Sequence, residues 1–226
     1  MNILIPAYKP DERLIELVET LLKEKYEVLV VNDGSGKEYD SIFEKLNQNI
    51  VLLNHDKNKG KGRAMKTGFE YILNNFPESE GVITVDADGQ HLPKDIEKVS
   101  KKMAEKPDKM VIGSRQFKGD VPLRSRFGNS VTKFVFAVVS GLRLSDTQTG
   151  LRGIPYSRLK EMSELEGERY EYEMNMLMHI AKNKIPVSEV FIETVYIEEN
   201  ASSHFNTIRD SAKIYKVIFK YIFKRK

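Results

Sequence analysis

Short apolar runs alternate with longer, helically periodic stretches along the first half of the chain. The apolar runs predict strands at residues 2–7, 27–32, 50–54, 81–86 and 109–114. The periodic stretches predict helices at residues 12–23, 38–46, 62–75 and 93–105. Strands that alternate with helices through short connections predict an α/β fold, with a mostly parallel central sheet and helices on both faces. Helices at 126–142 and 172–182 and strands at 150–155 and 187–197 are expected in the less regular second half.

The length and composition restrict the class of protein. A chain of 226 residues can bury a sizeable core, and one domain is the default expectation. The absence of Cys excludes disulfides and thiolate metal sites. No segment has 18 uninterrupted apolar residues, so no membrane-spanning helix is predicted. The first apolar run follows no basic stretch, so we expect a strand there and not a signal peptide.

Acidic side chains follow two of the expected strands. Asp33 comes after the second strand in an Asp-Gly turn, and Asp86 and Asp88 stand at the end of the fourth. In open α/β sheets, ligands bind beyond the carboxyl ends of the strands. We therefore expect these acids to gather at one edge of the sheet with Tyr8 and Arg115.

Asp86 and Asp88 are two positions apart, so on an extended strand their side chains would share one face. Like charges held that close repel unless something positive lies between them. Together with Gln90 they provide hard oxygen ligands suited to Mg²⁺ or Mn²⁺, and such ions also bind substrate phosphates. The alternative is a plain strand end, at which one acid only caps the next helix.

The loop at residues 58–63, Asn-Lys-Gly-Lys-Gly-Arg, opens the third expected helix. Backbone amides at a helix N-terminus, together with lysines such as Lys61, favour a phosphate group. The spacing matches neither the Walker P-loop nor the Gly-x-Gly-x-x-Gly pattern. A solvated basic turn is the alternative.

Several arginines are expected near the same edge of the sheet. Arg115, Arg124 and Arg126 fall within twelve residues that also contain glycine and proline, which suggests a loop that attracts anions. Arg152 ends a further polar stretch that includes Asp146. Each of these arginines alone is a weak signal, because most surface arginines bind nothing specific.

Positive charge is concentrated at the end of the chain. Residues 207–226 carry seven basic side chains and one acid, so the net charge of +3 leaves residues 1–206 at about −3. In a helix, the apolar side chains of this segment share one face and its lysines another. The expected apolar face consists of Ile208, Ala212, Tyr215, Phe219 and Ile222. Such a helix either packs on the body or lies on an anionic membrane, where each Lys or Arg contributes about 1 kcal/mol, and we favour membrane contact.

Six segments, in this order and spacing, resemble the family 2 glycosyltransferases of the GT-A fold. The resemblance is to the dolichol-phosphate mannose synthase and GtrB-like branch, which loads a sugar onto a polyprenyl phosphate. The segments are residues 5–8, 31–35, 58–62, 86–91, 113–115 and 146–152. The resemblance implies a GT-A domain over residues 1–206. The amphipathic basic helix over 207–226 is then part of that domain or faces a membrane.

The resemblance also implies roles for individual residues. A divalent ion, Mg²⁺ or Mn²⁺, is expected at the D-x-D-x-Q element, formed by Asp86, Asp88 and Gln90. The nucleotide is expected to contact Pro6, Ala7, Tyr8, Asp33, Lys61, Asp86 and Ala87. The residues expected to act in catalysis are Asp88, Arg115 and Arg126. Candidates for contact with the acceptor or the diphosphate are Arg124, Ser130, Arg152 and His204.

The implied reaction is an inverting transfer of a sugar from a nucleotide-sugar to polyprenyl phosphate at the cytoplasmic face of the membrane. A phosphate monoester has a second pKa of about 6, so the acceptor is mostly ionised at neutral pH. It needs little help from a base, and we therefore expect no such role for Glu171 or Glu173, whose position near a helix start suits the helix dipole. Catalysis then rests on positioning and on neutralising the charge of the departing diphosphate.

Two departures from the family pattern affect the donor. Lys9-Pro10 replaces the usual Asn-Glu, so a nucleotide-contacting carboxylate is missing unless Asp11 or Glu12 takes its place. Residues 198–205 lack the usual basic clamp on the diphosphate, and His204 or Arg115 is the alternative. A UDP-sugar is favoured, and GDP-mannose is the alternative. The other expected partners are polyprenyl phosphate, an anionic membrane surface, and a separate small membrane protein or a second copy of the chain.

Other functions are compatible with parts of this pattern. Transfer to a saccharide or cell-wall polymer is the main alternative, and a catalytically idle docking module is another, although the intact D-x-D-x-Q element argues against idleness. A sugar-1-phosphate nucleotidyltransferase would need a glycine-rich loop after the first strand, and Pro6-Ala7-Tyr8-Lys9-Pro10 is not one. The slightly acidic body argues against nucleic acid as a partner.

Overall fold

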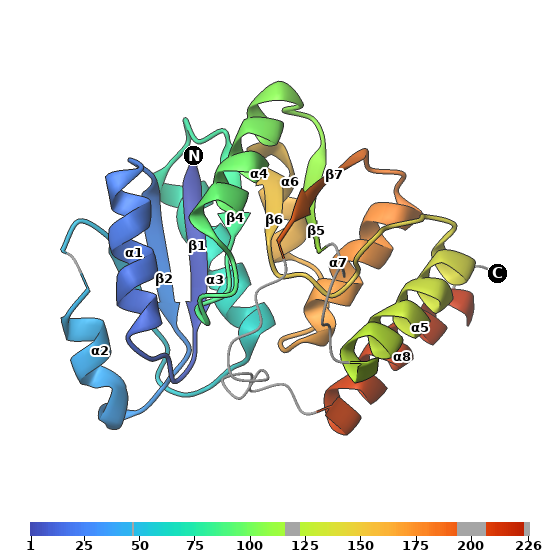
Figure 1. Cartoon of the computed structure of the whole chain (residues 1–226), viewed down its shortest axis with the longest axis horizontal. Coiled ribbons are helices and arrows are strands. Elements are labelled where there is room, and N and C mark those ends of the chain that lie inside the picture. The colour runs from blue at the N-terminus through green and yellow to red at the C-terminus, as the bar shows by residue number, and fades with distance from the viewer. Residues whose placement is uncertain (47, 116–122, 194–206, 224–226) are drawn as a thin grey trace.

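Seven strands form one sheet in the order β3-β2-β1-β4-β6-β5-β7 (Figure 1). They are β1 (Asn2–Ala7), β2 (Glu27–Asn32), β3 (Val51–Asn54), β4 (Gly81–Thr84), β5 (Met110–Arg115), β6 (Arg152–Pro155) and β7 (Val187–Ile192). All neighbouring strands pair in parallel except β6, which is antiparallel to both β4 and β5. The predicted mostly parallel sheet is therefore confirmed. This computed structural model describes residues 1–46, 48–115, 123–193 and 207–223, with the side chains of 123–130, 207–212 and 222–223 left out.

Helices cover both faces of the sheet (Figure 1). One face carries α1 (Arg13–Lys23), α2 (Asp40–Glu44), which follows a 3₁₀ turn at Lys37–Tyr39, and α4 (Pro93–Glu105). The other face carries α3 (Lys61–Asn75), α6 (Tyr156–Ser163) and α7 (Glu171–Lys182). Two longer helices, α5 (Leu123–Ser140) and α8 (Thr207–Phe223), pack on each other and on α7 at the side of the molecule.

The apolar pattern of the sequence accounts for this layering. In β1, Ile3 and Ile5 pack into the core under α1 and α4, whereas Leu4 packs into the core under α3. Side chains alternate along a strand, so a strand buried on both faces must be apolar throughout. The buried side chains of α1 recur at helical spacing, so that one stripe of the helix faces the sheet. They are Leu14, Leu17, Val18 and Leu21.

The structure corrects four local expectations. β4 ends at Thr84, so Asp86 and Asp88 lie in a turn and not on one face of a strand. The eight-residue α6 was not predicted, because so short a helix shows little periodicity. β7 ends at Ile192, and residues 194–197 of the expected strand lie outside the described residues. In α8 the inner face is not the one expected, since Ile214, Val217 and Ile218 are buried while Phe219 is half exposed.

The order of the strands sets where a ligand can bind. From β1 the chain moves outward through β2 to β3 and then returns to place β4 on the other side of β1. At such a switch point the loops after neighbouring strands separate and leave a crevice at their carboxyl ends. None of the described helices is both long enough and apolar enough to cross a lipid bilayer.

Candidate active site

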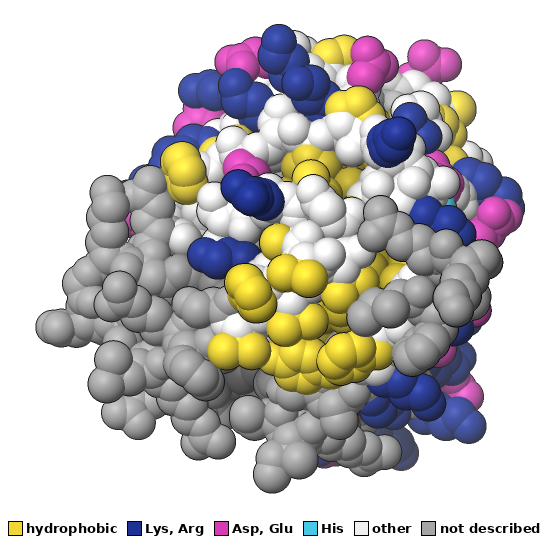
Figure 2. All heavy atoms as spheres, turned by 90° about the vertical axis from the view of Figure 1, so that its right-hand side faces the viewer, with side chains coloured by type: hydrophobic (Ala, Val, Ile, Leu, Met, Phe, Trp, Pro, Cys, Tyr) yellow, Lys and Arg dark blue, Asp and Glu magenta, His cyan; other side chains and the backbone are white. Residues whose placement is uncertain are grey.

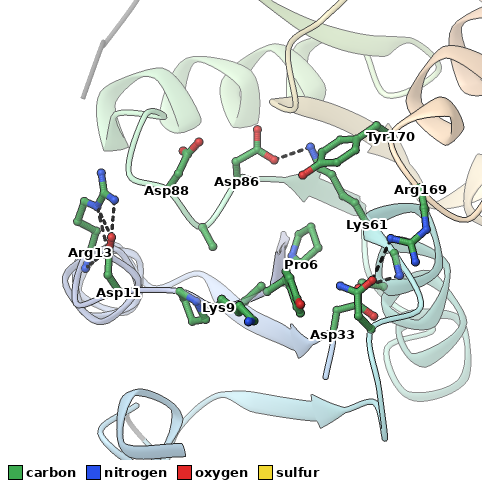
Figure 3. Close-up of a pocket in the computed structure, with 17 residues that line it drawn as sticks. Pro6, Lys9, Asp11, Arg13, Asp33, Lys61, Asp86, Asp88, Arg169 and Tyr170 are labelled. Atoms are coloured by element: carbon green, nitrogen blue, oxygen red, sulfur yellow. Dashed lines mark hydrogen bonds and ion pairs between the residues drawn. The ribbon is translucent and has the colours of Figure 1, made fainter. Parts of the chain in front are cut away.

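A pocket of about 300 Å³ opens at the carboxyl ends of β1, β2 and β4, at the switch point (Figure 3). Figure 3 shows Asp86 and Asp88 on one side of this pocket and Pro6 and Asp33 on the other. The pocket is lined by every residue that the sequence assigned to the nucleotide, and by Asp88. The assigned residues are Pro6, Ala7, Tyr8, Asp33, Lys61, Asp86 and Ala87.

Asp33 fixes the loop that precedes α3. Its Oδ1 accepts the backbone N–H of Lys59 at 2.9 Å and lies 2.7 Å from Nδ1 of His55. Its Oδ2 accepts the backbone N–H of Gly60 at 2.8 Å. Gly60 has a φ of 105°, and an added Cβ would lie 2.3 Å from the carbonyl oxygen of Glu168, so only glycine fits this approach. The acid therefore places the N-terminus of α3 at the pocket.

Lys61, the first residue of α3, reaches from that N-terminus to Asp86 (Figure 3). Its Nζ lies 2.6 Å from Oδ1 of Asp86 and 3.1 Å from Oε2 of Glu173, in the first turn of α7. Burial alone lowers the pKa of Lys61, but the charges of Asp86 and Glu173 outweigh burial and raise it. One lysine thus joins an acid that follows β4 to an acid in the first turn of α7.

The two acids after β4 differ in their surroundings. Burial raises the pKa of a carboxyl, but Lys61 and His91 together hold the pKa of Asp86 well below its usual range. Nε2 of His91 lies 3.2 Å from Oδ2 of Asp86, so each oxygen of this acid has a partner. Asp88 accepts the backbone N–H of Gln90 at 3.0 Å, and its pKa is raised by burial and by the negative charge of Asp86.

These donors suit a divalent cation. Burial, and after it the charge of Asp86, raises the pKa of Asp88, and a cation between the two acids would favour the charged form of both. Within the described residues, no three His, Asp or Glu side chains form a closed metal cage. The two carboxylates that line the pocket form an open set, which leaves coordination positions for phosphate oxygens. The alternative role of Asp88 as a helix cap is not observed, since the N-cap of α4 is Leu92 and no side chain caps it.

The predicted arginines do not all reach the pocket. Arg115 ends β5 and is held by the fully buried Asp146, with its Nε 2.6 Å from Oδ2. Arg152 is itself fully buried, which corrects the expectation that its guanidinium contacts a substrate directly. The side chains of Arg124, Arg126 and Ser130 and all of His204 lie outside the described residues.

Several residues that line the pocket were not assigned from the sequence. They are Lys9, Pro10, Asp11, Arg13, Asn58, Gly60, Ala64, Arg169 and Tyr170. In the sequence, Lys9 and Pro10 stand out only as a departure from the family pattern, Asp11 only as a possible replacement for the missing carboxylate, and Asn58 and Gly60 only as part of the basic loop. Arg169 donates from Nη1 to Oδ1 of Asn58 at 3.0 Å, across 111 positions of sequence. No local pattern marks such a contact, because it depends on how the segment before α7 packs on the loop before α3.

Comparison with known proteins identifies the family. A family model described as glycosyl transferase family 2 matches residues 2–160. The chain belongs to glycosyl transferase family 2. It is therefore a glycosyltransferase, as the resemblance of its motifs implied.

This family 2 glycosyltransferase has relatives that align over nearly all of its length. An uncharacterized protein of Methanocaldococcus jannaschii is 33% identical over 227 residues, covering 98% of this chain and 92% of that one. The UDP-N-acetylglucosamine--dolichyl-phosphate N-acetylglucosaminyltransferase of Methanococcus voltae is 31% identical over 240 residues, covering 96% of this chain and 94% of that one. The human dolichyl-phosphate beta-glucosyltransferase is 29% identical over 227 residues, covering 88% of this chain and 68% of that one.

A solved structure with the same fold is the glucosyl-3-phosphoglycerate synthase of Mycobacterium tuberculosis in complex with Mn²⁺, UDP-glucose and phosphoglyceric acid. The TM-score is 0.69, and the match covers 98% of this chain and 79% of that one. At 13% sequence identity the likeness establishes the fold alone, and it confirms the predicted GT-A fold.

Proposed function

We propose that this glycosyltransferase moves a sugar from a UDP-sugar to a polyprenyl phosphate, with a divalent ion held by Asp86, Asp88 and Gln90. The observation that carries the proposal is the pocket itself, in which the two acids and the loop before α3 face one another at the switch point. Relatives that cover most of this chain are named for transfer to dolichyl phosphate, which supports a lipid phosphate as the acceptor.

The bonding of Asp33 supports uracil as the base of the donor. A carboxylate has about four acceptor positions, and three of those on Asp33 are used by Lys59, Gly60 and His55. One position on Oδ2 remains, which suits the single N–H donor of uracil. The Watson–Crick edge of guanine presents two neighbouring donors, N1–H and the amino group, and would leave one of them unpaired at a cost of about 1–3 kcal/mol.

In the proposed reaction, an oxygen of the ionised acceptor phosphate attacks the anomeric carbon. The bond from that carbon to the donor diphosphate breaks, and UDP leaves with the electron pair. A bound divalent ion would supply positive charge to the diphosphate as its negative charge grows. Lys61 supplies a second positive charge, held by Glu173 in the same pocket. Arg126, with Arg124, Ser130 and His204, remains the proposed contact for the acceptor phosphate.

Titration with nucleotides followed by a transfer assay tests this function. We expect UDP to bind in calorimetry with Mn²⁺ present, and to bind more tightly than GDP. Sugar should then pass to polyprenyl phosphate in detergent but not to free saccharides. Binding of neither nucleotide would favour an idle docking module, and transfer to a saccharide would favour the polymer-acceptor alternative.

We further propose that α5 and α8 place the protein on the cytoplasmic face of a membrane. Figure 2 shows hydrophobic side chains gathered on the side of the molecule that carries these helices, with Lys and Arg at the border of the patch. Phe134 and Val138 are 70% and 67% exposed one turn apart on α5, and Phe219 of α8 is 49% exposed. Exposed aromatics beside lysines such as the exposed Lys216 suit an interface with anionic lipid.

Replacing Phe134, Val138 and Phe219 together by Ser is expected to weaken binding to anionic vesicles about tenfold or more, because the removal of even one large apolar side chain from lipid loses roughly 1.5–3 kcal/mol. Cosedimentation with vesicles measures this, and UDP binding should not change. The matched control is Phe191→Ser, since Phe191 is 55% exposed on β7. Equal loss in the control, or none in the triple variant, would contradict membrane contact through α5 and α8.

A further inference from the structure

Arg152 is a charged side chain that is fully buried in the centre of the sheet. It opens β6, where its backbone pairs with Thr84 of β4 and Ile112 of β5, and its exposed fraction is 0%. A guanidinium stays charged at any physiological pH. Burying such a charge is unfavourable unless its environment compensates, and an apolar side chain of similar volume is often as stable or more stable there. Stability of the fold alone is therefore a poor reason for an arginine at this position.

The contacts of the guanidinium lead to the active site. Nε donates to the carbonyl oxygen of Thr149 at 3.1 Å, and Nη1 donates to the carbonyl oxygen of Glu173 at 2.8 Å. Nη1 also lies 3.6 Å from Sδ of Met176, and Nη2 has no hydrogen-bond partner among the described residues. The planar fork thus joins the turn before β6 to the first turn of α7.

Both of these segments touch the acids of the pocket. Glu173 holds Lys61 at 3.1 Å, and Lys61 holds Asp86 at 2.6 Å. On the other side, Gly150 follows Thr149 and lies so close to Asp86 that an added Cβ would be 2.2 Å from Oδ2. The contacts therefore form a ring that runs from Arg152 through α7, α3 and the end of β4 and returns to the turn before β6.

We propose that Arg152 is a positioning residue of this active site. Its buried guanidinium fixes the first turn of α7 relative to the Thr149–Gly150 turn. This keeps the Glu173 carboxylate in contact with Lys61, and Lys61 in contact with Asp86. Arg152 touches neither donor nor acceptor and acts through Glu173. The proposal deepens the proposed function and rests on it only for the role of Lys61 toward the donor.

The first test needs no nucleotide. The rate at which an amine-labelling reagent modifies Lys61 is followed by mass spectrometry in the wild type, Arg152→Met and Arg152→Lys. We expect labelling about fivefold faster or more in Arg152→Met, because a coupling of the size typical for contacting groups is lost. The labelling rate of Lys61 in Arg152→Lys should lie between those of the wild type and Arg152→Met, since one ammonium group cannot make both hydrogen bonds of the guanidinium. Lys102 of α4, which pairs with Glu105 and does not contact α7, is the internal reference and should keep its rate.

A second test uses the affinity for UDP with Mn²⁺ in a double-mutant cycle. Arg152→Met and Lys61→Met should each weaken UDP binding about tenfold. The double variant should bind UDP as tightly as Lys61→Met alone. The matched control is Arg158→Met, since Arg158 of α6 pairs with Glu161 and should leave binding unchanged. Losses of affinity that multiply in the double variant would overturn the proposal. So would an unchanged labelling rate at Lys61, or an equal rise in the labelling rate at Lys102. Absence of UDP binding by the wild type would instead contradict the proposed function, and the labelling result would still decide the role of Arg152.

Discussion

Replacing Asp88 by Asn is expected to remove metal-dependent binding of UDP and to lower kcat by about 10²–10³-fold. Asp88 is a better target than Asp86, because Asp86 also bonds to Lys61 and His91, so that changing it disturbs the pocket in several ways. The Asp88 side chain accepts a hydrogen bond from the backbone N–H of Gln90, and an Asn oxygen can still accept it. The substitution therefore removes a negative charge and leaves the shape.

Calorimetric titration of UDP with and without Mn²⁺ measures the first effect, and sugar transfer to polyprenyl phosphate measures the second. The matched control is Asp108→Asn, an exposed acid in the turn before β5, which should behave as the wild type. Metal-dependent UDP binding that survives in Asp88→Asn would contradict the metal assignment. Nucleotide binding that is equally strong without metal in the wild type would contradict it as well, and would point to Lys61 as the main partner of the diphosphate.

Gly150→Ala is expected to lower activity about 10²-fold through a shift of Asp86, because a displacement of about 1 Å in a reacting site has effects of this size. The added Cβ would lie 2.2 Å from Oδ2 and 2.6 Å from Cγ of Asp86, far inside van der Waals contact. The backbone cannot easily retreat, because the hydroxyl of Thr84 donates to the carbonyl oxygen of Gly150 at 2.7 Å. The carboxylate must therefore move away from Lys61 or His91.

Gly153→Ala, three residues further along, separates this effect from a general loss of packing. Its added Cβ would lie 2.4 Å from Sδ of Met103, in the core beneath α4 and away from the pocket. Both variants should lose about 1–3 kcal/mol in the free energy of unfolding, measured with urea, because both overfill a packed interior. Only Gly150→Ala should also lose UDP affinity in the folded protein. Equal UDP affinity in the two variants would show that Gly150 does not set the position of Asp86.

Most of the secondary structure could be predicted because it depends on local patterns. The apolar runs of β1 and β2 and the helical spacing of α1 are complete within about ten residues each, and they appear where expected. The antiparallel direction of β6 could not be predicted, since four residues with no side-chain alternation carry no information about direction. The end of β4 at Thr84 was missed for a similar reason, because the apolar run continues through Val85, whose backbone N–H still donates to Leu4 of β1.

The sequence by itself determined which residues stand at the carboxyl ends of β1, β2 and β4. An apolar run marks each strand, and the residues that follow parallel strands lie at the same edge of the sheet. The sequence therefore placed Asp33, Asp86 and Asp88 around one pocket. Only the tertiary structure decided what each side chain does there. Lys61 meets Glu173 across 112 positions of sequence, and Arg152 turns inward to α7 and away from solvent. Partners and burial depend on which distant segments the packing brings together, and no local pattern specifies them.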